Sequence, residues 1–166
     1  MGVLDLLTNV GLAHRRERRE LRGASGLLTR EMERAAASIR FALGENSWGS
    51  LNWNALVLTS WPDGSQLLAE GLRPDDWAVV EDAARASGEL LALRGTDRRI
   101  LPNADGGPPD ADRYELLTTA TELEDAVLTL ERVSGWSDPA NGIRLTRELM
   151  AGSDEPWVVG ERHIVE

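Results

Sequence analysis

Few residues in this chain could carry catalytic or metal chemistry. Cysteine is absent, and the two histidines, His14 and His163, lie at opposite ends of the sequence. A zinc site needs several closely placed Cys or His ligands, and a Ser-His-Asp triad needs a histidine beside its nucleophile. Neither histidine follows a glutamate by three residues, which is the Glu-x-x-His motif of di-iron bundles. The sequence therefore predicts no catalytic residue, no metal site and no cofactor.

Carboxylates are the remaining source of acid–base chemistry. Glu122, Glu124, Asp125 and Glu131 fall close together, and Glu124 and Glu131 stand seven residues apart beside an apolar stripe. We interpret them as the solvated flank of a helix, as is usual for charges beside such a stripe. An enzyme that uses clustered carboxylates, with or without a metal, is the weaker alternative.

The N-terminal region combines apolar and basic residues in a pattern typical of a peripheral membrane anchor. Residues 1–40 carry a net charge of +3, whereas residues 41–166 carry −13. Apolar side chains of such a segment enter the membrane interface, and arginines contact anionic headgroups. The alternative is an ordinary solvated helix, in which Glu17 and Glu20 pair with the arginines between them. The residues expected to contact a membrane or a partner are Leu6, Leu7, Val10, Arg15, Arg16, Arg18, Arg19 and Arg22.

Six tryptophans stand out in a chain with one tyrosine and one phenylalanine. Trp61 and Trp77 stand at the starts of expected helices next to apolar stripes, so we expect them to pack in the core or to wedge against the helix ends. The other four fall in expected loops or in the tail, where an exposed indole is a candidate partner contact. These candidates are Trp48, Trp53, Trp136 and Trp157.

Helices must position these residues. Apolar residues recur at alternating spacings of four and three in two stripes, Leu28 to Ala42 and Leu116 to Leu130, which is typical of helices packed side by side. Pro62 and Pro74 each sit in a first helical turn, with Ser60 as the expected N-cap of the earlier helix. We expect helices at about 15–43 with a possible break at 23–26, then at 61–71, 74–93, from 110 or 112 to 134, and at 139–150. Residues 45–60 read as a loop with a short extended piece at 55–59.

The expected fold is all-α: a helical bundle of three to four main helices with irregular loops and a short C-terminal tail. We divide the 166 residues into an N-terminal apolar arm, 1–14, and a single helical-bundle domain, 15–166. No apolar run is long enough for a membrane-spanning helix, and the first residues lack the features of a signal peptide.

Part of the chain resembles a group of uncharacterised actinobacterial proteins. The run LTREMERAAASIRFAL, a loop, then Trp61 and LLAEGLRPDDW ending at Trp77 are similar to a small helical domain that follows an arginine-rich juxtamembrane stretch in those proteins. The resemblance covers residues 15–93 and implies no activity or catalytic residue. The chain departs from it at the start, where Met1 to Leu12 stand in place of a spanning helix.

These observations favour a non-enzymatic helical interaction or scaffold protein. We expect a cytoplasmic location, since the chain lacks cysteine, with peripheral attachment to the inner membrane leaflet through residues 1–22. A protein partner or a homo-oligomer is expected, and the alternative function is a self-assembling or partner-bound bundle subunit. The net charge of −10 disfavours nucleic acid as a partner.

Overall fold

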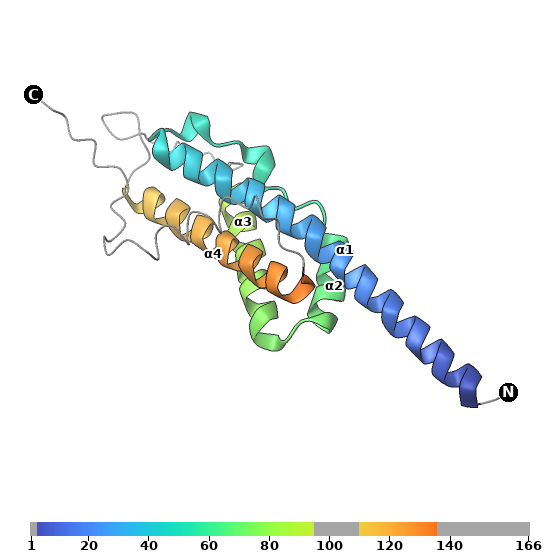
Figure 1. The fold of residues 1–166 in the computed structure, drawn as a ribbon. Coiled ribbons are helices and arrows are strands. Elements are labelled where there is room, and N and C mark those ends of the chain that lie inside the picture. Colours follow the sequence, from blue (N-terminus) through green and yellow to red (C-terminus); the bar gives the residue numbers. More distant parts are fainter. Residues whose placement is uncertain (1–2, 95–109, 136–166) are drawn as a thin grey trace, which may run out of the picture.

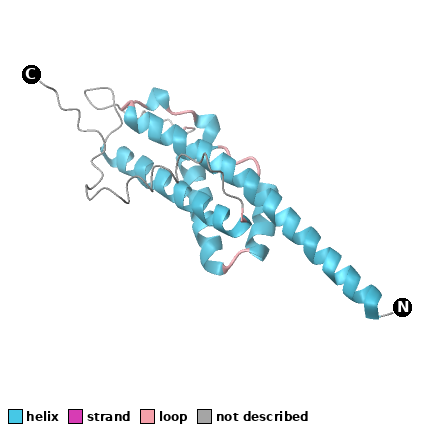
Figure 2. Ribbon diagram, viewed as in Figure 1, coloured by secondary structure: helices cyan, strands magenta, loops and turns pink. Residues whose placement is uncertain are grey.

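The computed structural model describes residues 3–94 and 110–135, and in the first and last helices it describes side chains from Arg15 and from Asp112 onward. This part of the chain contains four α-helices, α1 to α4, two short 3₁₀ turns, η1 and η2, and no strand (Figure 2). The all-α helical bundle predicted from the sequence is confirmed.

The longest element is α1 (Val3–Gly44). The prediction that this helix starts near Arg15 was wrong, because the helix begins at Val3. The possible break at residues 23–26 does not occur, and the helix continues through Gly23 and Gly26. A glycine costs a helix only about 1 kcal/mol relative to alanine. The packing of Ser25 and Leu28, which are buried on either side of Gly26, offsets such a cost.

The C-terminal end of α1 is closed by a defined cap. Asn46 adopts a left-handed conformation with φ of 48°. The backbone N–H of Ser47 donates to the carbonyl of Ala42, and that of Asn46 donates to Leu43. This pair of bonds is the Schellman arrangement, which satisfies the last carbonyls of a helix.

The core forms where α1 meets α4 (Asp110–Ser134), which runs antiparallel beside it (Figure 1). Both predicted stripes face this contact, and each of their residues is at most 1% exposed. The α1 stripe consists of Leu28, Met32, Ala35, Ile39 and Ala42, and the α4 stripe of Leu116, Ala120, Leu123, Val127 and Leu130. Packing of two such stripes supplies most of the stability of a helix pair.

Two shorter helices complete the bundle, α2 (Trp61–Gly71) and α3 (Pro74–Leu93), which begin and end as predicted. α2 packs on α1, and α3 packs mainly on α4. Val80 and Ala84 of α3 are buried, whereas Trp77 and Leu91 are only half-buried. Ser60 stands at the N-cap of α2, although its side chain makes no capping bond.

Residues 45–60 differ from the prediction of a loop with an extended piece. They form two 3₁₀ turns, η1 (Trp48–Ser50) and η2 (Trp53–Leu56), so the expectation of an extended piece was wrong at its first two residues. The side chains of Ser47 and Asn52 each accept a hydrogen bond from a backbone N–H two residues later, at Gly49 and Asn54. These local bonds favour turns over extended chain.

Several predictions fall outside the described residues, namely the helix at 139–150, the apolar tail, Trp136 and Trp157. Among the described helices, none combines the length and apolarity that crossing a bilayer requires.

Candidate interaction surface

The helix α1 has two parts with different surroundings. Among the described side chains of α1, which begin at Arg15, Leu21 is the first that is half-buried. It packs against the end of α2 so closely that a Cβ at Gly71 would lie 2.7 Å from its Cδ1. Residues 15–20 are all exposed. Residues 3–20, here called the overhang, extend past the other helices into open space (Figure 1). All of the residues that the sequence predicted to contact a membrane or a partner, except Arg22, belong to the overhang.

Four arginines of the candidate set line one side of the overhang and its first packed turn. Arg15, Arg18, Arg19 and Arg22 are spaced i, i+3, i+4 and i+7, and positions with this spacing share a face of a helix. All four are exposed, and no hydrogen bond or ion pair joins them to other described side chains. We call this set the arginine stripe.

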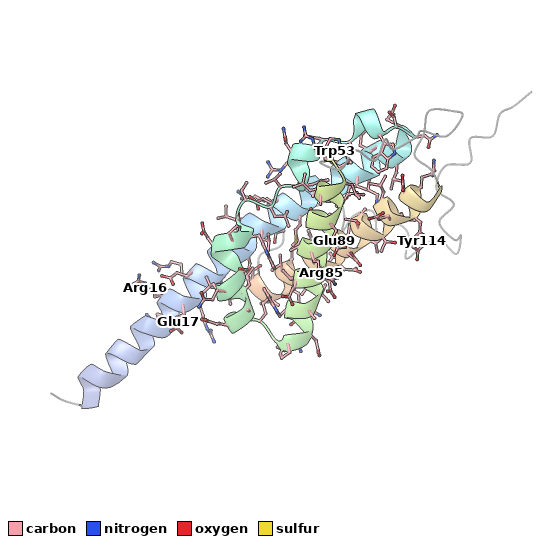
Figure 3. The ribbon with its side chains drawn as sticks, turned by 180° about the vertical axis from the view of Figure 1, so that it is seen from behind. Arg16, Glu17, Trp53, Arg85, Glu89 and Tyr114 are labelled. Carbon is pink, nitrogen blue, oxygen red and sulfur yellow. The ribbon has the colours of Figure 1, made fainter. Side chains whose placement is uncertain are left out.

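The glutamates of this segment lie off the arginine stripe. Arg16 donates a hydrogen bond from Nε to Oε1 of Glu20 over 2.8 Å, and this bond raises the pKa of the Arg16 guanidinium above its usual value. Figure 3 shows Arg16 and Glu17 on the part of α1 that leaves the bundle. The alternative of an ordinary solvated helix, in which glutamates pair with arginines, therefore applies to Arg16. The four arginines of the arginine stripe are not paired with Glu20.

The apolar positions of the overhang have a defined register because α1 is continuous. Eighteen residues make five turns of an α-helix. Val3 and Val10 therefore fall on the same side of the helix as Leu21 and Leu28, the side that faces the bundle, and positions 6 and 7 flank them. The overhang thus extends the bundle-facing side of α1 past the end of the bundle.

The tryptophans with described side chains form two stacked pairs. The ring centroids of Trp48 and Trp53 are 5.9 Å apart, and those of Trp61 and Trp77 are 5.5 Å apart, with nearly parallel planes in both pairs. All four rings are half-buried and pack against the core. Trp48 and Trp53 therefore already use much of their surface within the chain, and a role in partner contact stays a prediction.

The prediction that Glu124 and Glu131 lie on a solvated flank was wrong. Glu124 accepts two hydrogen bonds from Arg40 of α1, over 2.8 and 2.9 Å, and Glu131 is only 7% exposed. This two-pronged Arg–carboxylate geometry is the strong form of such a pair. The bond joins α1 to α4, and the sequence separation of 84 residues explains why periodicity alone missed it.

Two other carboxylates are buried and fully engaged. Glu31 accepts hydrogen bonds from the hydroxyl of Thr59 and from the backbone N–H of Ser60, the latter over 3.0 Å. Asp76 accepts from Arg73 over 2.9 Å and from Arg132 over 2.5 Å. The Arg73 hydrogen bond is the main reason that the pKa of Asp76 lies below its ordinary value. These side chains tie α1 to α2 and α3 to α4.

Glu122 lies in an acidic neighbourhood between α3 and α4. Its pKa is raised, first by partial burial and then by the nearby Asp82 carboxylate, with Glu89 and Asp125 adding to the repulsion and Arg85 opposing it. Arg85 itself bonds Asp82. The described residues contain no group of three or more His, Asp or Glu placed to hold a metal ion.

No family model, curated protein or solved structure matches this chain.

Proposed function

We propose that the protein is a non-enzymatic interaction protein that attaches peripherally to an anionic membrane surface, on the cytoplasmic face, through the overhang of α1. The four-helix bundle serves as the folded body that this attachment holds in place. The observation that carries the proposal is the arginine stripe, a set of four exposed cations on a helix that leaves the bundle.

Charge complementarity supports an anionic surface. Basic residues next to an anionic leaflet contribute roughly 1 kcal/mol each, so the stripe offers about 4 kcal/mol, or roughly a thousandfold in affinity. The bundle carries most of the acidic residues, so the overhang is the part of the molecule that such a surface attracts. The apolar residues before the stripe add the second signal that stable peripheral binding requires.

The positions of the carboxylates support a non-enzymatic function. Glu31, Asp76 and Glu124 are occupied by hydrogen bonds that hold helices together. A general acid or base must instead reach a proton on a substrate. Of the carboxylates considered from the sequence, Glu124 is therefore already engaged in holding α1 to α4.

Vesicle co-sedimentation tests the proposal. The full chain is expected to bind vesicles that contain phosphatidylglycerol and to lose binding as salt is raised. The triple variant R15Q/R18Q/R19Q should bind about a hundredfold more weakly, given roughly 1 kcal/mol per arginine.

The matched control is R34Q/R85Q/R94Q, which changes the net charge equally at exposed arginines of the bundle. It should retain nearly full binding. If both triple variants lost vesicle binding equally, the effect would depend on net charge alone, which would contradict the proposal. Tighter binding to a single-stranded oligonucleotide than to vesicles would also contradict it.

Self-assembly is the second candidate function, favoured by the register of the overhang. Because the bundle-facing side of α1 continues to Val3, a helix from another copy or another protein could cover it as α2 and α4 cover the rest. Light scattering of the full chain across a wide concentration range tests the homotypic form. A rise in mass that is lost in the variant L7A would favour it, and a constant monomer mass would contradict it.

A further inference from the structure

We infer that the overhang enters the membrane tip first, tilted away from the membrane plane, with the arginine stripe at the headgroups and the bundle outside the bilayer. This inference rests on the proposed membrane attachment and specifies how it occurs. Interfacial amphipathic helices ordinarily lie flat, with the apolar side buried in the interface. The register of α1 argues against that mode here.

The apolar positions of the overhang and the bundle lie on the same side of α1. Leu21 and Leu28, which share the helix side of Val3 and Val10, pack against the neighbouring helices. Packed helices have axes about 8–10 Å apart. A membrane plane that touched the whole apolar side of the overhang would therefore pass through α2 and α4, and α1 has to tilt to keep the bundle out.

The length and charge of the overhang fit tip-first entry. Residues 3–14 contain a single carboxylate, Asp5, and span about 18 Å as a helix. The hydrocarbon core of a bilayer is about 30 Å thick, so this segment reaches roughly through one leaflet. A helix satisfies its own backbone hydrogen bonds in lipid, and the side facing away from the bundle has only uncharged polar residues besides Asp5, namely Thr8 and Asn9.

Tip-first entry places the arginine stripe at the depth of the lipid headgroups. Arg15 follows directly after the apolar segment, and Arg22 lies about 10 Å further along the axis. Arginine side chains extend toward the headgroups while their stems stay in less polar surroundings. The first packed residues of the bundle begin at the same height, so the bundle rests just outside the headgroups.

Single-cysteine labelling distinguishes a tilted helix from a flat one, since the natural chain has no cysteine. Positions 6 and 8 are two residues apart and therefore fall on nearly opposite sides of the α1 helix. The full-length variants L6C and T8C, each with a nitrobenzoxadiazole label, are mixed with phosphatidylglycerol vesicles. Emission and quenching by aqueous iodide are then measured.

Tip-first entry predicts a blue shift and loss of quenching of similar size at both positions. The exposed bundle position R34C is the control and should stay fully quenched. Protection of L6C with an accessible T8C would show a flat helix and overturn the inference while the membrane attachment stands. Protection of R34C would place the exposed surface of the packed part of α1 on the membrane and would also overturn the inference.

Two further outcomes separate the inference from the proposed function. If the labelled protein sediments with vesicles but neither overhang position is protected, attachment is electrostatic only and the inference fails. If the protein does not sediment with anionic vesicles at all, the inference fails together with the proposed function.

Discussion

The two parts of α1 share one continuous helix but differ in what surrounds them. From Leu21 onward the helix contributes a bundle-facing side that is almost fully buried, and its arginine Arg40 is bound to Glu124. Before Leu21 the same register continues with no neighbouring helix among the described residues, and the arginines are exposed. The comparison shows that sequence periodicity specifies which side of a helix is apolar. The length of the neighbouring helices decides where that side is buried in a core and where it stays available to a partner.

The largest effect is expected from truncating one leucine in each part of α1. Leu7 and Leu28 are three seven-residue repeats apart on the bundle-facing side. L28A creates a cavity in the core and should lower the free energy of unfolding by about 2–5 kcal/mol. L7A should change it by less than about 0.5 kcal/mol, the usual range for positions outside a core. Urea denaturation measures both, and equal destabilisation by the two variants would contradict the division of α1.

Asp76 offers a smaller effect with a defined pH dependence. Because Arg73 and Arg132 hold its pKa below the ordinary value of 3.8, the charged form stabilises the folded state above that pH. D76N should therefore lower Tm near neutral pH, and the difference from the natural chain should close as the pH falls below 3.8.

The control for this prediction is D75N, at an exposed residue of the same helical turn. It removes the same charge and should alter Tm much less. The comparable pair of the overhang, Arg16 with Glu20, is solvent-exposed, so E20Q should hardly affect Tm. If E20Q lowered Tm as much as D76N, the exposed ion pair of the overhang would stabilise the fold as strongly as the buried Asp76 of the bundle, which would contradict the prediction.

The smallest expected effect comes from the acidic neighbourhood of Glu122. Its raised pKa means that the folded state binds a proton more readily than the unfolded chain, so stability increases as the pH falls toward that pKa. E122Q should raise Tm slightly at pH 7 and flatten this pH dependence. E115Q, at an exposed position of the same helix, is the control. A lower Tm for E122Q would show that the carboxylate stabilises the fold at neutral pH.

Local patterns were enough to predict most of the architecture. The stripes around Met32 and Leu123 and the prolines at the starts of α2 and α3 act within one or two helical turns, so they are visible in the sequence. The start of α1 was missed because residues 1–14 were assigned to a separate apolar arm, whereas the helix begins at Val3.

Contacts between distant residues could not be predicted in this way. Arg132 and Asp76 are 56 residues apart, and only the packing of α3 on α4 brings them together. The arginines of the candidate surface were identified from the sequence. Their position relative to the apolar side of the overhang could not be predicted, because it depends on the helix continuing unbroken from Val3 into the bundle.

The continuity of α1 has a mechanical consequence. At 1.5 Å per residue, the 42 residues of α1 form a helix about 63 Å long, and more than half of this length packs against the other helices of the bundle. A helix of this length would bend most easily at Gly23 and Gly26. Both glycines lie in the part of α1 that packs in the bundle, beside the buried Ser25. A partner that binds the first turns of α1 therefore also fixes the orientation of the whole bundle relative to itself.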